Sequence, residues 1–271
     1  MFKDEKISKF NLTKEDDDYF SLRCTRKISK YFTILLLHTN ISANQVTIID
    51  ILLGILSAVL FSFGHYSLSV IAAFTLQLWY IFDCVDGEVA RARNQCTSEG
   101  LYLDYVGHDI VQPIVYIGIG FGVISSNEQL LNMQLHGNYW ILFLSFICCH
   151  FSVLRDNMMS NRFRIFFSRI SQSKSNAPRE IKMIPRDLIT ETLNKKNNKS
   201  SFASSIIPYY IKLRFIFVYP FVMNAITIAA IFKLLPLIVI FYGITLPLLW
   251  LLSVFRTFKS GVEKDGMMLY G

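Results

Sequence analysis

The sequence predicts an all-α integral membrane protein, with six transmembrane helices preceded by an amphipathic helix that lies in the membrane interface. Of the 271 residues, 52% are hydrophobic and the mean hydropathy is +0.39, which is too apolar for an ordinary soluble domain. Lipid offers backbone groups no water to bond, so each spanning segment must be helical. Six apolar stretches approach spanning length: 46–63, 68–90, 101–124, 139–154, 211–232 and 234–255.

These stretches divide the chain into three regions. Residues 1–42 are predicted to form a cytoplasmic tail and the interfacial helix, residues 43–258 the six-helix domain, and residues 259–271 a second cytoplasmic tail. Within the six-helix domain, a basic loop is expected at about 155–210. Its middle part is rich in Ser, Asn and Lys, which is typical of a solvated connection.

Lysine and arginine set the expected orientation in the cell membrane, because cytoplasmic segments retain them. In the predicted topology 26 of the 27 basic residues lie on one side, and only Lys233 lies on the other. The connections 64–67 and 125–138, on the side of Lys233, carry none. Both termini are therefore expected in the cytoplasm.

The amphipathic helix is predicted from Phe20 onward. One face carries the basic residues Arg23, Arg26, Lys27 and Lys30, and another carries Phe20, Cys24, Ile28, Tyr31 and Leu35. Such a helix lies in the membrane interface. Two interpretations stay open: it anchors the chain through its positive charges, or it forms a wall of a site for an anionic substrate.

Ionisable side chains gather at the cytoplasmic ends of the second and third predicted spans. Such residues are costly inside spans and are retained mainly at functional sites. The second span ends with Asp83, Asp86 and Glu88, and the third begins with Asp104, His108 and Asp109. A transporter is disfavoured, because this cluster lies at one membrane face whereas transport sites lie near the midplane.

Helical geometry predicts which of these side chains meet. At about 100° per residue, Glu88 points away from the side of the second helix that holds Asp83, Asp86, Gly87, Ala90 and Arg91. One face of the third helix holds Gly100, Asp104, Gly107 and His108. A short connection between the helices would bring together Asp83, Asp86, Asp104 and His108.

Three converging carboxylates in a low dielectric repel one another unless a cation neutralises them. Oxygen-rich sites of this kind suit Mg²⁺ or Mn²⁺, and the metal would in turn bind a diphosphate near Arg91. The alternative is a set of buried ion pairs that only stabilise the bundle. It is weakened because Arg91 and Arg93 are the only nearby cations for six acids.

The spacing of these residues resembles the signature of the CDP-alcohol phosphotransferases, also called CDP-alcohol phosphatidyltransferases. The pattern D-x2-D-G-x2-A-R-x8-G-x3-D-x3-D is matched at every position but the last, by Asp83, Asp86, Gly87, Ala90, Arg91, Gly100 and Asp104. The run 44–47 also resembles the family's usual entry to its first span. The resemblance covers most of the chain and leaves the first tail and residues 155–214 outside.

The resemblance implies an enzyme of phospholipid or related polar-lipid biosynthesis. A CDP-alcohol would bind through its diphosphate to a two-metal centre, and an acceptor hydroxyl would attack the phosphorus that bears the alcohol, releasing CMP. Carried over by position, the metal ligands are Asp83, Asp86 and Asp104, and the cytidine diphosphate pocket is lined by Gly87, Ala90, Arg91 and Gly100, with Asn44 and Thr47 beside it. The expected partners are the two alcohols, the bilayer and a second copy of the chain, but no nucleic acid.

The chain departs from the family pattern at His108, which replaces the last aspartate. That aspartate is the residue thought to activate the acceptor hydroxyl. The neighbouring Asp109 cannot replace it, because it faces about 100° away. His108 is therefore expected to act beside Asp104 as the base, or to bind the metal. The alternative is a catalytically silent membrane protein of the same fold that binds a nucleotide or lipid. The donor and acceptor alcohols are not identified by the sequence.

Overall fold

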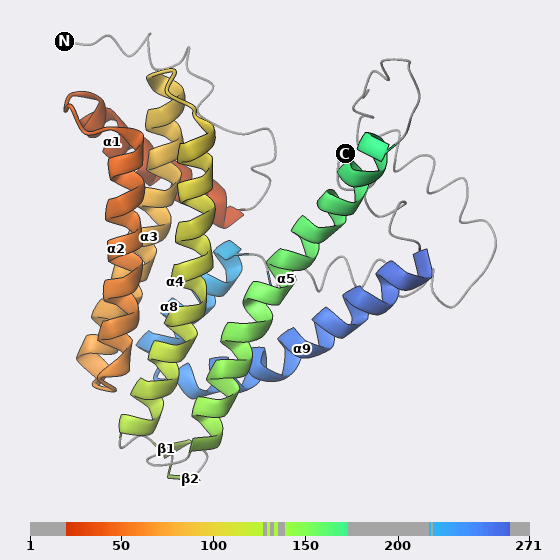
Figure 1. Cartoon of the computed structure of the whole chain (residues 1–271). Helices are drawn as coiled ribbons and strands as arrows, with labels where there is room; N and C mark the ends of the chain where they lie inside the picture. The colour runs from red at the N-terminus through yellow and green to blue at the C-terminus, as the bar shows by residue number, and fades with distance from the viewer. Residues whose placement is uncertain are drawn as a thin grey trace. The chain divides into compact units, whose positions relative to one another are not determined.

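The computed structural model describes residues 20–126, 129–130, 133–134, 139–172, 217 and 219–260. Almost all of them are helical (Figure 1). The helices are α1 (Phe20–Leu37), α2 (Ala43–Ser62), α3 (Tyr66–Ala92), α4 (Ser98–Ser125), α5 (Tyr139–Gln172), α8 (Tyr219–Ile231) and α9 (Leu235–Ser260). Two-residue strands, β1 (Gln129–Leu130) and β2 (Met133–Gln134), pair antiparallel between α4 and α5. The prediction of an all-α architecture is thus confirmed, with this one small addition.

Four helical segments are long and apolar enough to cross a membrane. They are α2, α3, α4 and the segment Leu235–Phe255 of α9. Two more apolar segments are shorter, Tyr139–Leu154 in α5 and Pro220–Ile231 in α8. Each of the six predicted stretches therefore contains helix. The fifth is described only from its middle onward, because residues 211–216 lie outside the described part of the chain.

The predicted loop at about 155–210 is wrong in its first part, since α5 continues as a helix to Gln172. The apolar run ends at Leu154, which is why the sequence predicts a loop from residue 155 onward. Loss of hydropathy ends a membrane span but does not end a helix, and neither proline nor glycine interrupts residues 155–172. Residues 173–210 of the predicted loop, and residues 1–19 and 261–271 of the predicted end regions, lie outside the described residues.

The described residues fall into two compact units. One lies within residues 1–149 and 218–243, and the other within residues 150–217 and 244–271. α5 passes from the first unit to the second after Cys149, and α9 does so after Gly243. In the second unit, Phe151 packs edge-on against Trp250 with 5.7 Å between ring centroids. The residues that the sequence singles out for chemistry all belong to the first unit.

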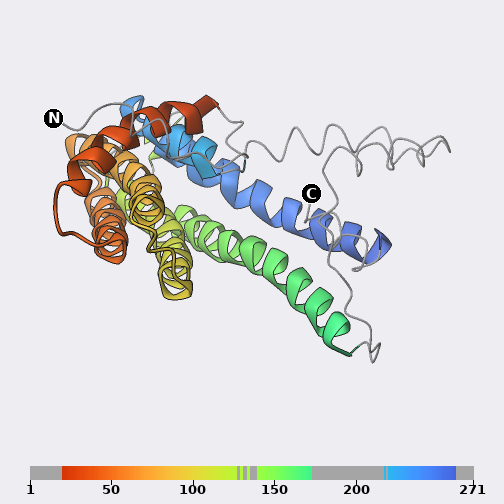
Figure 2. The ribbon, with the colours of Figure 1, turned by 90° about the horizontal axis from the view of Figure 1, so that it is seen from above.

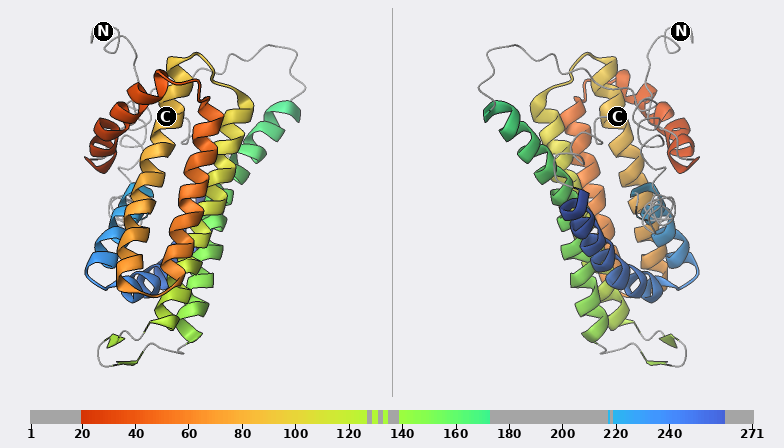
Figure 3. Two further views of the ribbon diagram at one scale, coloured as in Figure 1. Left: turned by 90° about the vertical axis from the view of Figure 1, so that its left-hand side faces the viewer. Right: turned by 90° about the vertical axis from the view of Figure 1, so that its right-hand side faces the viewer.

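Within the first unit, α2 packs against both α3 and α4 (Figure 3). Small residues allow the close approach to α4. A Cβ atom added at Gly118 would collide with the carbonyl oxygen of Ala58, and one at Gly122 would collide with that of Phe61. Glycine at these positions lets the two helix backbones touch, as is common where helices pack in membranes.

α1 lies across the end of the bundle where α3 ends and α4 begins (Figure 2). It is fastened there by Glu88 of α3, whose side chain is completely buried. The Glu88 carboxylate accepts hydrogen bonds from Ser29 Oγ at 2.8 Å, Thr33 Oγ1 at 2.6 Å and Arg26 Nη1 at 3.2 Å. A buried carboxylate is costly in a low dielectric unless it is compensated. Here three hydrogen-bond donors from α1 compensate the charge of Glu88.

Arg93 holds the connection between α1 and α2. Its guanidinium donates to the carbonyl oxygens of Leu36 at 3.0 Å, Thr39 at 2.7 Å and Ile41. Arg26 lies 62 positions before Glu88 in the chain and pairs with it only after the helices pack. The prediction that Arg91 and Arg93 are the only cations near the acidic residues is therefore wrong.

The buried ion pair generates a first prediction. Arg26→Ala leaves Glu88 buried without its cation, which should lower the free energy of unfolding by about 3 kcal/mol. Lys27→Ala is the matched control, because Lys27 is exposed on the same helix and its removal should have little effect. Chemical denaturation in detergent micelles measures both. Equal stability of the two variants would show that the pair does not hold α1 in place.

Candidate functional site

A tight connection between α3 and α4 positions the acidic cluster. Residues 93–97 join the helices, and Asn94 adopts a left-handed backbone conformation with φ of 53°. Thr97 is the N-cap of α4, where its hydroxyl accepts a hydrogen bond from Gly100 N at 3.1 Å. The last turns of α3 therefore lie beside the first turns of α4, and α2 packs against both helices.

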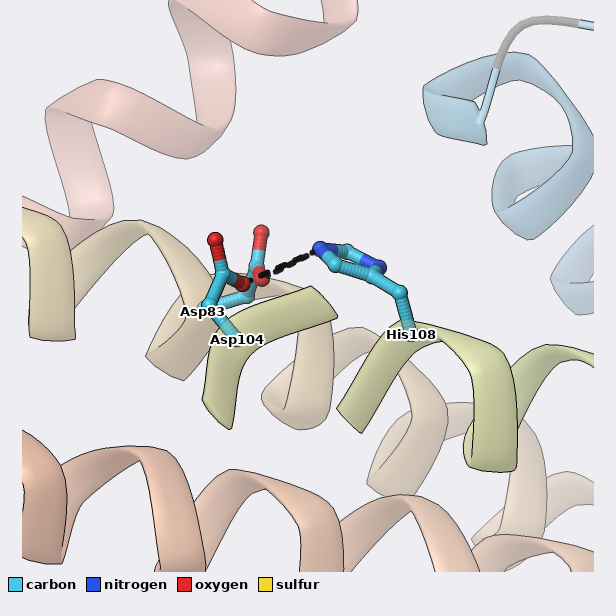
Figure 4. Close-up of side chains that lie close together, drawn as sticks. All are labelled: Asp83, Asp104 and His108. Carbon is cyan, nitrogen blue, oxygen red and sulfur yellow. Dashed lines mark ion pairs between the residues drawn. The ribbon is translucent and has the colours of Figure 1, made fainter. Parts of the chain in front are cut away.

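Three of the predicted residues meet at this point (Figure 4). His108 Nε2 lies 3.0 Å from Asp83 Oδ1 and 3.3 Å from Asp104 Oδ1. One potential ligand atom from each residue lies within 4.8 Å of the other two. Figure 4 shows the carboxylates from α3 and α4 side by side, with the imidazole turned toward them. All three side chains are half-buried, so the cluster is accessible to a small ligand.

Asp86 lies beside this trio and is held by α2. Its Oδ2 accepts a hydrogen bond of 2.6 Å from Thr47 Oγ1, and both residues are buried. Asp83 and Asp104 are the carboxylates whose charges act on Asp86. Asp109, in contrast, is exposed.

Four of the predicted pocket residues lie close together in pairs. A Cβ atom at Gly87 would come 3.2 Å from Arg91 Nη1, so the Arg91 side chain folds back over Gly87. A Cβ atom at Gly100 would come 3.0 Å from Asn44 Oδ1, so the first turn of α2 meets the first turn of α4 there. The two glycines thus leave space beside a guanidinium and an amide, which are groups able to bind phosphate and base.

Ala90 has a different environment from its predicted neighbours. It packs against an apolar core formed where α1, α2 and α3 meet, whose buried members are Ala43, Val46, Val85 and Val89. Ala90 is only partly buried there, and its predicted contact with the cytidine diphosphate stays a prediction.

The donor set fits a divalent cation. Two carboxylates and one imidazole converge, with a third carboxylate beside them. Carboxylate oxygens suit Mg²⁺ and Mn²⁺, and an imidazole in the set favours the transition ion. Without a cation, the carboxylates repel one another in the low dielectric of the bundle.

Sequence reasoning missed one more carboxylate, the buried Asp50 of α2. Its side chain is only 3% exposed, and Asp86, Asp83, His108 and Asp104 are the charges that act on it, Asp86 most strongly. Asp50 is an acidic residue within the first predicted span, one turn after Thr47, and this position in the sequence could have identified it as a candidate. Asp50 stands alone in the first predicted span, whereas the predicted site rests on the ionisable clusters of the second and third spans.

Residues 40–182, just over half of the chain, match the family model for CDP-alcohol phosphatidyltransferases. The chain belongs to this family. No curated protein matches it significantly. The match reaches further into the 155–214 segment than the motif-based resemblance did, but it stops before α8 and α9 and so covers less of the chain than expected.

As a CDP-alcohol phosphatidyltransferase, this protein is a multi-pass membrane transferase of lipid biosynthesis. The family uses a divalent metal, and the group formed by Asp83, Asp104 and His108 is able to hold one. Its substrates are of the classes that the family uses, a CDP-alcohol and an acceptor.

The contact between Thr47 and Asp86 generates the second prediction. Thr47→Val keeps the shape of the side chain but removes the hydroxyl that orients the carboxylate, so kcat/KM for the CDP-alcohol should fall at least about tenfold. Thr47→Ser should retain most activity. Thr75→Val is the matched control, because the Thr75 hydroxyl donates only to its own helix, at Ile71 O. A Thr47→Val enzyme as active as Thr75→Val would exclude this positioning role.

Proposed function

We propose that this protein transfers the phosphoalcohol group of a CDP-alcohol to the hydroxyl of an acceptor alcohol, with release of CMP. The observation that carries the proposal is the convergence of Asp83, Asp104 and His108 in a chain of the CDP-alcohol phosphatidyltransferase family. Family membership indicates the classes of substrate, and the convergence of these three side chains supports a metal-dependent reaction site at the ends of α3 and α4. The geometry favours no particular pair of alcohols.

We assign the metal ligands to Asp83, Asp86 and Asp104, and the ions to two Mg²⁺ or Mn²⁺. When bound, divalent ions neutralise the charge that develops on the leaving phosphate. The support for this assignment is electrostatic: Asp83 and Asp104 act on Asp86 within a helical bundle, and the guanidinium of Arg93 is bonded to backbone carbonyls of Leu36, Thr39 and Ile41. Thr47 contributes by fixing the orientation of Asp86.

We place the cytidine diphosphate moiety along Gly87, Arg91, Gly100 and Asn44. Gly87 and Gly100 lack side chains where the diphosphate must approach the helices. Arg91 supplies positive charge one turn after Gly87, and its fork of donors matches phosphate oxygens. Asn44 offers both a donor and an acceptor, as recognition of a nucleobase or ribose requires.

His108 is the proposed proton acceptor. As the acceptor oxygen forms its bond to phosphorus, the bond from phosphorus to the CMP oxygen breaks, and the hydroxyl proton passes to the imidazole. A hydrogen bond from Nε2 to a carboxylate requires a proton on Nε2, and a protonated Nε2 cannot act as a base. Nε2 can take the hydroxyl proton only in the tautomer that carries its proton on Nδ1, which requires Asp83 and Asp104 to be engaged elsewhere. Binding of His108 to the metal is the other role that its position allows.

The proposed topology has six spans, both termini in the cytoplasm, and α1 in the interface. The 26 to 1 division of basic residues supports the orientation. Ile28, Tyr31 and Leu35 are exposed along one side of α1, which supports contact with lipid. The acidic cluster then opens to the cytoplasm, where water-soluble nucleotides are present.

The metal assignment yields the third prediction. Purified protein in detergent should release CMP from a suitable CDP-alcohol and acceptor only with Mg²⁺ or Mn²⁺ present, and Mn²⁺ should be the better ion. Asp83→Asn and Asp104→Asn should each reduce this rate more than about a hundredfold, because each removes a ligand while keeping the shape. Asp109→Asn, one residue from His108 but exposed, should keep its rate.

Full turnover in excess chelator would contradict the proposed mechanism. His108→Ala should lose most turnover and keep CDP binding. A wild-type protein that binds CDP and Mn²⁺ but releases CMP with none of a broad panel of alcohols would favour the catalytically silent alternative, more strongly still if His108→Asp released CMP.

The fourth prediction tests the orientation. Cys96 is exposed in the connection between α3 and α4, and Phe232 is 68% exposed between α8 and α9, at the other face of the proposed topology. In intact cells an impermeant maleimide should leave Cys96 unlabelled and should label a Phe232→Cys variant. Permeabilisation should make Cys96 reactive, as peptide mass spectrometry would show. Labelling of Cys96 from outside would reverse the proposed orientation.

A further inference from the structure

Asp50 lies on the inward face of α2, between two residues whose contacts define that face. One turn earlier, Thr47 donates its hydroxyl to Asp86 of α3. One turn later, Gly54 packs against Val111 of α4. Asp50 is therefore directed toward the region between α3 and α4, and it is buried with them.

The Asp50 carboxylate lacks the compensation that the other buried acids have. Within the described part of the chain, its Oδ1 is fully buried and has no hydrogen-bond partner. Glu88, equally buried, has three donors from α1, and Asp86 has Thr47. An uncompensated carboxylate costs several kcal/mol in such surroundings, on the order of the stability of a whole domain.

The charges that act on Asp50 identify what it faces. They are those of Asp86, Asp83, His108 and Asp104, which are the four residues of the proposed metal centre. Three of these are acids, so in the absence of a cation Asp50 adds to an existing excess of negative charge. Thr47, one turn before Asp50 on the same face of α2, contacts Asp86, which places Asp50 on the Asp86 side of the cluster.

We infer that Asp50 is a further carboxylate ligand of the divalent-metal centre, on its Asp86 side; this rests on the proposed function. The motif of this chain supplies three carboxylates, because His108 stands at its last position. Asp50, which belongs to α2, would be the fourth carboxylate of the centre. A bound cation would supply the compensation that the protein does not give Asp50 Oδ1.

A Mn²⁺ titration without substrate tests this inference separately from catalysis. Purified full-length protein is titrated in detergent, and free Mn²⁺ is measured by electron paramagnetic resonance. Asp50→Asn should raise the Mn²⁺ concentration needed for half-saturation at least about tenfold. Asp109→Asn, which removes the same charge from an exposed position, should bind as the wild type does. Asp83→Asn is the reference for loss of a ligand of the proposed centre.

The outcomes separate this inference from the proposed function. Weak binding by Asp83→Asn together with wild-type binding by Asp50→Asn would overturn the inference and leave the metal centre in place. Wild-type binding by both variants would overturn the two proposals together. Weak binding by Asp83→Asn and Asp50→Asn, but not Asp109→Asn, is the expected result.

Two further measurements exclude misfolding as the cause of weak binding. The metal-free Asp50→Asn protein should unfold at a temperature no lower than the wild type, because the substitution removes a buried charge from a negative cluster. The double variant Asp50→Asn/His108→Asp should regain Mn²⁺ affinity, since the fourth carboxylate is restored at the motif position. Failure of this folded double variant to regain affinity would overturn the idea that Asp50 takes the place of the missing carboxylate.

Discussion

A carboxylate inside a helical bundle must be compensated, and the packing of the first helices follows from how each acid meets this constraint. Glu88 is neutralised by a basic side chain and two hydroxyls from α1, which therefore lies across the end of the bundle. Asp86 takes its hydrogen bond from Thr47, which ties α3 to α2. Asp83 of α3 and Asp104 of α4 both pair with the imidazole of His108, which links these two helices through side chains. Structure and site thus depend on the same electrostatic requirement.

α2 has a larger part in the site than a supporting helix would have. Its capping box at Ser42 and Gln45 starts the helix at Ala43. Asn44 and Thr47 then lie in its first turns, where Asn44 meets Gly100 of α4 and Thr47 donates a hydrogen bond to Asp86 of α3. Glycines of α4 bring its backbone against that of α2 farther along. The register between the helices is then fixed by close packing, and side chains of α2 are held at defined positions beside those of α3 and α4.

Local rules of helix geometry were sufficient for the parts of the site that lie on consecutive turns. They placed Asp83 and Asp104 on facing sides and directed Glu88 elsewhere, because periodicity within one helix fixes relative direction. The pairing of Arg26 with Glu88 was beyond these rules, since it joins helices separated by another span. Asp50 was missed for a related reason: its neighbours become apparent only when α2 is placed between α3 and α4. The full extent of α5 was missed because hydropathy indicates which residues suit the membrane, and it does not indicate where a helix ends.

The contact between α1 and Glu88 has a consequence for the order of events during synthesis. The ribosome delivers α1 first, and Glu88 follows only after α2 and most of α3 have been translated. In that interval Arg26, Ser29 and Thr33 cannot yet bind Glu88. The contact between α1 and α3 therefore forms as a late docking step, once α3 has been made and packed beside α2.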